Sequence, residues 1–257
     1  MLRFICLVFF LFPIFCSPNL WSSGNYDNCI LKNIKSIASD VAAQAIIDIC
    51  VIKYKDKPNS ICIETDAKIT NDIIFLKTIS EPFSGKNYCE YPNYVTKSKG
   101  DIKNGKKNDK WMWWHIDGNV GLEINYIDGK KNGKLIKWHK YQDNLFGSIS
   151  LEGQIELEEN YKDDKKNGKS IKWYPSGQIE LEEIYKDDKK NGKSIKWYSD
   201  GQIELEENYK DDKKDGKSIS WYPSGQIQLE EIYKDDKKDG KSIKWYSDGQ
   251  IELEENY

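Results

Sequence analysis

The feature that most constrains this chain is a repeat with a period of 24 residues in its C-terminal part. One unit reads GKSIKWYPSGQIELEEIYKDDKKN, and two columns of residues mark the period. The columns are formed by the glycines Gly168, Gly192, Gly216 and Gly240 and the tryptophans Trp173, Trp197, Trp221 and Trp245. A fixed period of this length is typical of small supersecondary units that each bury their apolar side against a neighbour. We therefore expect an array, stabilised by stacking, in place of one central core.

Each unit predicts its own β-hairpin. Pro175 suits the second position of a type I turn that begins at Tyr174, and Gly177 tolerates the left-handed conformation of the bulge that follows. The run from Lys186 to Lys190 is expected to be a longer connection to the next unit.

The turn also predicts a register. If it alone sets the pairing, Trp173 lies opposite Ile179, Lys172 opposite Glu180, Ile171 opposite Leu181 and Lys169 opposite Glu183. Strand alternation then places one set of residues on a single face, namely Ile171, Trp173, Ile179, Leu181 and Tyr185. The other face receives Ser170, Lys172, Tyr174, Glu180 and Glu182.

Degenerate units extend the array upstream, since Gly133 with Trp138 and Asp109 with Trp114 repeat the pattern. The predicted fold is mainly β, an elongated antiparallel β-hairpin array of meander or solenoid type that follows a small α-helical hairpin. The expected organisation is a signal peptide over 1–24, a helical hairpin with a cysteine pair over 25–57, a linker or β segment over 58–82, degenerate repeats over 83–138, an insertion loop over 139–152 and regular repeats over 153–257.

The first residues predict export. Arg3 precedes an apolar run from Phe4 to Phe15, and small and polar residues follow. Such a run is too short to span a bilayer and has the length of the apolar region of a signal peptide. The expected location is the periplasm, the cell surface or the extracellular space. Lipoprotein anchoring at Cys16 is the alternative, although Pro13 and Phe15 stand where such signals carry small or aliphatic residues.

Four cysteines remain after the leader, and in an exported chain they predict two disulfides. Three connectivities can be drawn. Apolar residues at helical spacing over 29–38 and 40–53 predict two helices joined at Ser39 and Asp40, which would bring Cys29 and Cys50 together. We therefore predict the disulfides Cys29–Cys50 and, by elimination, Cys62–Cys89.

Composition excludes several functions. Residues 151–257 hold 19 lysines against 27 acidic residues, a balance of −8, so no nucleic-acid partner is expected. Phosphate-binding, dinucleotide-binding, nucleophile-elbow and H-E-x-x-H motifs are missing from the sequence, which predicts a protein that is not an enzyme and has no cofactor. No metal site is expected. His115 and His139 stand where later units have tyrosine and are interpreted as the same outward position.

The units resemble the MORN-type repeats of bacteria, in the variant with the pattern G-K-x-x-x-W/Y-Y-x-x-G-x-(I/L)-x-x-E-x-x-Y. The resemblance covers residues 83–257 as seven units. It implies a scaffold, a membrane-associated protein or an antitoxin or immunity partner of a bacterial toxin, and it brings no catalytic residues. The leader and the cysteine-containing segment depart from the cytosolic antitoxin-like members.

The function predicted from the sequence is that of an exported repeat protein that offers a binding surface to a protein partner. The candidate binding residues form a tyrosine column, Tyr174, Tyr198, Tyr222 and Tyr246, whereas the tryptophan and glycine columns are assigned structural roles. Toxin neutralisation and lipid binding are the alternatives. The acidic array does not favour attraction to anionic lipid.

Overall fold

The computed structural model describes residues 59–140 and 153–257. Within these ranges the chain forms strands and turns, and no helix occurs. The predicted signal peptide, the helical hairpin of 25–57 and the disulfide Cys29–Cys50 lie outside the described residues, as does most of the predicted insertion loop. The mainly β, antiparallel hairpin array is confirmed.

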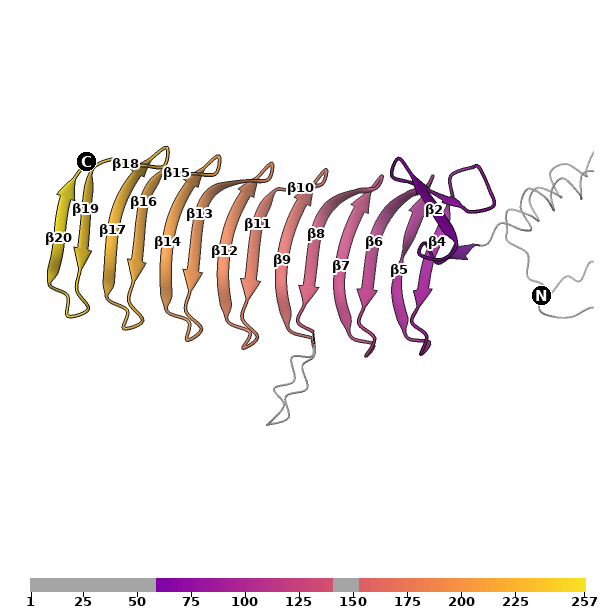
Figure 1. Ribbon diagram of the computed structural model, residues 1–257, viewed down its shortest axis with the longest axis horizontal. Helices are drawn as coiled ribbons and strands as arrows, with labels where there is room; N and C mark the ends of the chain where they lie inside the picture. Colours follow the sequence, from indigo (N-terminus) through magenta and orange to yellow (C-terminus); the bar gives the residue numbers. More distant parts are fainter. Residues whose placement is uncertain (1–58, 141–152) are drawn as a thin grey trace, which may run out of the picture. The chain divides into compact units, whose positions relative to one another are not determined.

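The strands of the array follow one another along a single sheet in chain order (Figure 1), and each pairs antiparallel with the next. The first three hairpins are β4 (Gly85–Glu90) with β5 (Thr96–Lys103), β6 (Lys106–Trp114) with β7 (Val120–Ile127), and β8 (Lys130–Trp138) with β9 (Ile155–Lys162). The next two are β10 (Lys165–Lys166) and β11 (Gly168–Trp173) with β12 (Ile179–Lys186), and β13 (Lys189–Trp197) with β14 (Ile203–Lys210). The last two are β15 (Lys213–Lys214) and β16 (Gly216–Trp221) with β17 (Ile227–Lys234), and β18 (Lys237–Lys238) and β19 (Lys241–Trp245) with β20 (Ile251–Asn256).

The turn inside each hairpin is the predicted one. The amide of Gly177 donates to the carbonyl of Tyr174 at 2.8 Å, and the amide of Tyr174 donates to Gln178 at 2.8 Å. Gly177 has a φ of 87°, the left-handed conformation of the bulge residue. Trp173 pairs with Ile179 as expected.

The rest of the predicted register is wrong by one residue. A second bulge between Lys172 and Trp173 sets Lys172 opposite Leu181, so that Ile171 faces Glu182 and Ser170 faces Glu183. A one-residue slip exchanges the faces of every residue beyond it. Leu181 and Tyr185 therefore do not share a face with Ile171. The expected ion pair between Lys172 and Glu180 still forms, at 2.9 Å.

The connection between hairpins is shorter than predicted. Lys186 pairs with Lys189, which leaves a two-residue turn of Asp187 and Asp188 with φ values of 50° and 70°. Positive φ at both positions is the signature of a type I′ turn. Asp188 also clasps the preceding hairpin, since its amide donates to the carbonyl of Lys166 at 2.9 Å and its Oδ1 accepts from the amide of Lys166 at 2.7 Å.

These pairings define two faces of the sheet. The leucine face carries Ser170, Lys172, Leu181, Glu183 and Tyr185 and their equivalents in other hairpins. The isoleucine face carries Lys169, Ile171, Glu182 and Ile184 and their equivalents.

The buried core lies on the leucine face of the first hairpins. The described residues before β4, called the covering segment, lie over this core. In this segment β1 (Ser60–Ile61) pairs parallel with β4, and β2 (Ala67–Thr70) and β3 (Ile73–Leu76) form a separate hairpin. Cys62 is bonded to Cys89 of β4, which is the disulfide predicted by elimination. The core comprises Ile61, Ile74, Leu76, Phe83, Ile102, Trp111, Ile124, Tyr126 and Leu135.

Candidate interaction surfaces

The leucine face changes character along the array. In the second and third hairpins its central column holds Trp111, Ile124 and Leu135, and Trp111 is fully buried. From β9 onward the same column is polar: Glu159 faces Leu135, a serine faces a buried glutamate in each of the next three hairpins, and Ser242 faces the exposed Glu255 in the last. The buried members are Glu159, Ser170, Glu183, Ser194, Glu207, Ser218, Glu231 and Ser242.

Each buried glutamate has two fixed partners. Tyr185 donates its hydroxyl hydrogen to Glu183 at 2.7 Å, and Lys190 forms an ion pair with the other carboxylate oxygen. The ammonium of Lys190 also lies 5.0 Å from the ring centroid of Tyr209 in the next hairpin. A ladder of alternating carboxylate, lysine and tyrosine therefore links each of these hairpins to the next, by charge-assisted hydrogen bonds and cation–π contacts.

The ladder perturbs the pKa of its members. Burial alone would raise the pKa of Glu231, but the hydrogen bonds from Lys238 and Tyr233 outweigh it and hold that pKa below its ordinary value. Burial and the hydrogen bond to Glu231 raise the pKa of Tyr233 to about 12. These groups therefore keep a charged glutamate and a neutral tyrosine over a wide pH range.

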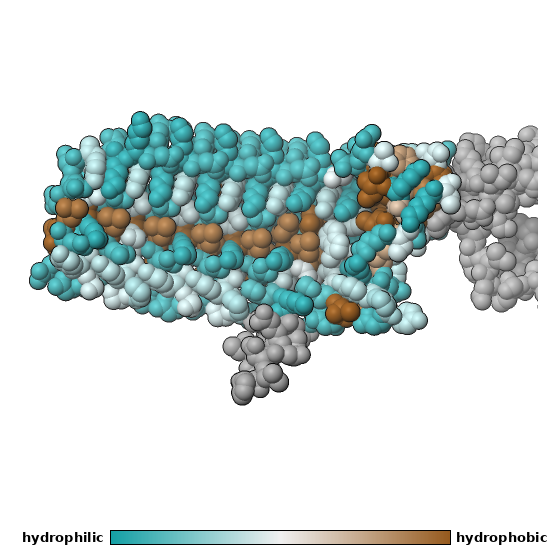
Figure 2. Space-filling view, in the orientation of Figure 1, coloured by the Kyte–Doolittle hydropathy of each residue, from teal (hydrophilic) through white to brown (hydrophobic). Residues whose placement is uncertain are grey.

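Beside the ladder runs an apolar column that begins against the buried core and continues along the later hairpins. Its members on the later hairpins are Leu157, Leu181, Leu205, Leu229 and Leu253. The first four are half-buried and Leu253 is 48% exposed. Figure 2 shows a hydrophobic band along this face, from the part beneath β2–β3 toward β20.

The isoleucine face carries a second ladder, made of surface ion pairs. In each hairpin a lysine of the first strand pairs with an acidic residue of the second. The pairs are Lys86–Asp101, Lys110–Glu123, Lys134–Glu158, Lys169–Glu182, Lys193–Glu206, Lys217–Glu230 and Lys241–Glu254, at 2.7–3.0 Å. Isoleucines such as Ile171 and Ile195 lie on either side of the Glu182-type column, half-buried.

The predicted tyrosine column fastens neighbouring hairpins to one another. The hydroxyls of Tyr174, Tyr198 and Tyr222 each donate to the carbonyl of the next tryptophan in the series, Trp197, Trp221 and Trp245, at 2.8 Å. Their rings are half-buried, whereas Tyr246 is 50% exposed. The tryptophans Trp173, Trp197, Trp221 and Trp245 are likewise half-buried. The glycines of the Gly168 column all have positive φ, which explains why glycine recurs there.

The two histidines occupy positions of the same column. Nε2 of His139 lies 3.3 Å from the carbonyl oxygen of Trp173, as a tyrosine hydroxyl would. Nε2 of His115 is buried against Gly121 and has no hydrogen-bond partner in the structure. Among residues 59–140 and 153–257, no group of three or more His, Cys, Asp or Glu side chains could hold a metal ion. No helix in these ranges is long and apolar enough to cross a bilayer.

A lysine cage lies where the covering hairpin meets the array. The ammonium of Lys107 lies 4.7 Å from the ring of Trp111, 5.1 Å from Trp113 and 5.3 Å from Tyr126. Burial, with a smaller contribution from the charge of Lys131, lowers the pKa of Lys107. Lys107 also lines a cavity of about 640 Å³ next to β2–β3. The equivalent lysine of a later hairpin, Lys166, forms an ion pair with the buried Glu159. Lys107 instead contacts three aromatic rings.

The array and its two polar ladders define a β-hairpin repeat protein. Its neighbouring units are joined by backbone and side-chain hydrogen bonds and by ion pairs. The comparison with known families gives the particular repeat: residues 166–187, 190–211, 214–235 and 238–257 match the family of the MORN repeat variant. These four consecutive units are therefore similar to the MORN repeat variant. No curated protein gives a significant match to the chain.

Sequence reasoning did not find the buried serine–glutamate column or the lysine–tyrosine contacts. The sequence does contain a pattern that indicates these contacts, because Glu183, Tyr185 and Lys190 recur at fixed spacing in every regular unit. The expected register placed Glu183 opposite Lys169, whereas the structure pairs it with Ser170 and meets its carboxylate with Tyr185 and Lys190.

Proposed function

We propose that this protein is an exported, non-enzymatic scaffold that offers the leucine face of its hairpin array to a protein partner. MORN repeats are generally modules that bind proteins or lipids, which supports a binding role for the four matched units. The repeat has no need of a catalytic centre for such a role, because the recognising groups are spread along the sheet.

One observation carries the proposal. The segment with Ile74, Leu76 and Phe83 covers the leucine face of the first hairpins, but over β9–β20 no segment of the described chain lies on that face. The leucine column there stays partly accessible. Large contiguous apolar surface on a protein marks a site of interaction, and Figure 2 shows this band continuing from the covered part.

Charge favours a protein partner over a membrane. Residues 151–257 have a balance of −8, and every described lysine of the buried ladder from Lys166 to Lys238 is paired with a glutamate. Attraction to anionic lipid needs unpaired clusters of lysine and arginine. An apolar band beside neutralised charges matches the composition of a protein-binding surface.

Export is supported by the disulfide between Cys62 and Cys89. Structural disulfides persist in oxidising compartments and are rare in the cytosol. The apolar run that follows Arg3 is the second support.

The experiment is an affinity capture with the full-length protein from the envelope and secreted fractions of the producing cell. Leu205→Lys with Leu229→Lys places charge on the leucine face, and Ile195→Lys with Ile219→Lys is the matched control on the opposite face. We expect the first variant to lose its main partner and the control to keep it. Equal recovery with both variants would exclude the leucine face, and capture of lipid vesicles in place of protein would exclude the protein partner.

A further inference from the structure

We infer that a pocket on the isoleucine face of the first two hairpins binds a glutamate or aspartate side chain of a protein partner, in a segment where apolar residues flank the acid. The site is separate from the leucine face, and its occupant is inferred from the lysine–glutamate pairs that the rest of the array forms on this face. It rests on the proposed protein-binding role and adds a second, charge-selective contact to it.

The isoleucine face has one column that is acidic throughout except at its first member. On successive second strands the column holds Lys99, Glu123, Glu158, Glu182, Glu206, Glu230 and Glu254. Each glutamate pairs with the lysine of its own hairpin. Lys99 reverses the charge, and Lys86, which begins this hairpin, pairs with Asp101 instead, at 3.0 Å.

The reversal leaves a cation without a partner. Among the residues that the structure describes, Lys99 has no ion pair and no side-chain hydrogen bond, and its side chain is exposed. A lone surface lysine is common, but this one stands where six other hairpins hold a carboxylate that pairs with a lysine of the same face. A carboxylate is therefore the complementary group for Lys99.

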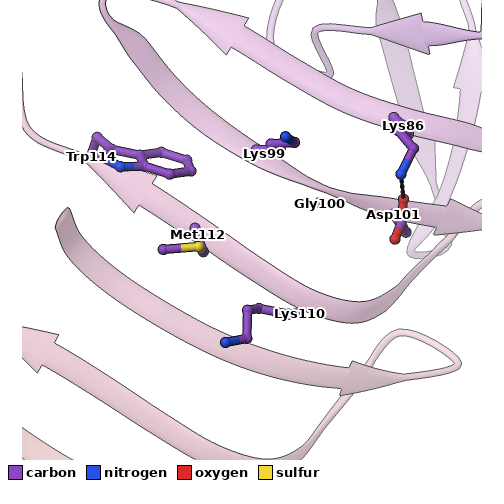
Figure 3. Close-up of a pocket in the computed structure, with 7 residues that line it drawn as sticks. All are labelled: Lys86, Lys99, Gly100, Asp101, Lys110, Met112 and Trp114. Carbon is purple, nitrogen blue, oxygen red and sulfur yellow. Dashed lines mark hydrogen bonds and ion pairs between the residues drawn. The ribbon is translucent and has the colours of Figure 1, made fainter. Parts of the chain in front are cut away.

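The pocket has the chemistry for an acidic side chain with an apolar neighbour. It encloses about 260 Å³ and is lined by Lys86, Lys99, Gly100, Asp101, Lys110, Met112 and Trp114. Figure 3 shows Lys99 between the Lys86–Asp101 pair and the side chains of Met112 and Trp114. Of the three lining lysines, Lys86 is paired with Asp101 and Lys110 with Glu123, which leaves Lys99 as the cation available to a ligand among the described residues. The indole and the thioether supply an apolar floor, and methionine adapts its shape to a contact.

The size of the pocket selects the kind of occupant. Sites for small molecules enclose roughly 300–1,000 Å³, and this one is smaller and open to solvent. It accommodates one or two side chains of an extended segment. In the regular hairpins a strand of sequence Ile-Glu-Leu-Glu-Glu places a glutamate against a lysine on this face, as Glu206 pairs with Lys193 at 2.7 Å between Ile195 and Ile219. A segment of that composition is the occupant we assign.

The chain offers a specific reporter, because Met1 and Met112 are its two methionines. In the full-length protein labelled with ¹³C at the methionine methyls, the Met112 signal reports whether the pocket is filled. The probe is the peptide acetyl-Ile-Glu-Leu-Glu-Glu-amide, and its neutral counterpart carries glutamine at each glutamate. We expect the acidic peptide, and not the neutral one, to shift the Met112 signal to saturation, with weaker binding at high salt.

Two variants decide the assignment. Lys99→Glu restores the acidic column and is expected to weaken binding of the acidic peptide by about tenfold, the loss of one charge-assisted hydrogen bond. Lys103→Glu makes the same charge change on the same strand outside the pocket and should change the affinity by less than about twofold. No saturable shift of Met112, an equal shift with the neutral peptide, or equal losses in both variants would overturn the site. Those results would leave the leucine-face capture experiment unaffected.

Discussion

The hydroxyl of Tyr209 lies 2.6 Å from Oε2 of Glu207, two residues earlier on the same strand. Lys214 holds the other oxygen of that carboxylate at 2.5 Å, and only 7% of Glu207 is exposed. A carboxylate buried to this degree is stable only while its partners are in place. The most regular hairpins are therefore held together by a polar ladder where the first hairpins have an apolar core.

Removing the charge of Glu207 should destabilise the array. Glu207→Gln removes the buried carboxylate and leaves the half-buried Lys214 without its ion-pair partner, and we expect a loss of about 1–3 kcal/mol in the free energy of unfolding. Urea denaturation followed by circular dichroism measures it. The control is Glu206→Gln, which breaks a surface pair with Lys193 and should cost about 0–1 kcal/mol. Equal losses for both variants would contradict a special role for the buried ladder.

The ladder predicts sensitivity to alkali. The pKa of Tyr233 is raised to about 12 by burial and by Glu231, and an unfolded tyrosine titrates near 10. A group whose folded pKa is raised stabilises the fold fully below its unfolded pKa and loses that effect as the pH rises to the folded value. Thermal stability should therefore fall between about pH 10 and pH 12. Tyrosinate absorbance should appear late in a titration of the folded protein, and Tyr233→Phe should reduce the fall in stability.

Gly100 should not accept a side chain. A Cβ at this position would lie 2.2–2.5 Å from the ring atoms of Trp111. Trp111 is fully buried and its indole donates to the carbonyl of Asp101 at 3.0 Å, so the ring has little room to move. We expect Gly100→Ala to cost about 1–3 kcal/mol, as overpacking in cores does. In the Trp111→Leu background the same change should cost less, and a cost that stayed the same would assign the effect to the backbone.

Asp188 combines a turn conformation with a clasp to the preceding hairpin. Asp188→Ala loses the hydrogen bond to the amide of Lys166 and places alanine at a φ of 70°, for an expected loss of about 2 kcal/mol. Asp188→Gly loses the bond but adopts this φ freely, so about 1 kcal/mol is expected. Calorimetry of both variants tests this order. Asp187→Gly is the control, because the side chain of Asp187 forms no hydrogen bond with any residue in the described ranges, and it should be nearly neutral.

The sequence by itself determined the local structure of this protein. The period of 24 residues, the hairpin in each unit, the type I turn at Tyr174 to Gly177 and the pairing of Trp173 with Ile179 all follow from residues close together in the chain. Such features depend on local backbone preferences and on strand alternation, which the residue order contains directly. The pairing of Cys62 with Cys89 was also reached, through elimination.

Only the tertiary structure decided which face each residue occupies. Over residues 179–185, Ile-Glu-Leu-Glu-Glu-Ile-Tyr, apolar and charged residues occur at both parities, so the strand is compatible with either of two registers that differ by one residue. The bulge beside Lys172 selects the register in which Glu183 is buried, and that register is favourable because Lys190 and Tyr185 meet the carboxylate. The apolar core around Trp111 was also decided by the tertiary structure. It forms where the segment with Phe83 packs onto the first hairpins, and these contacts join residues that lie far apart in the sequence.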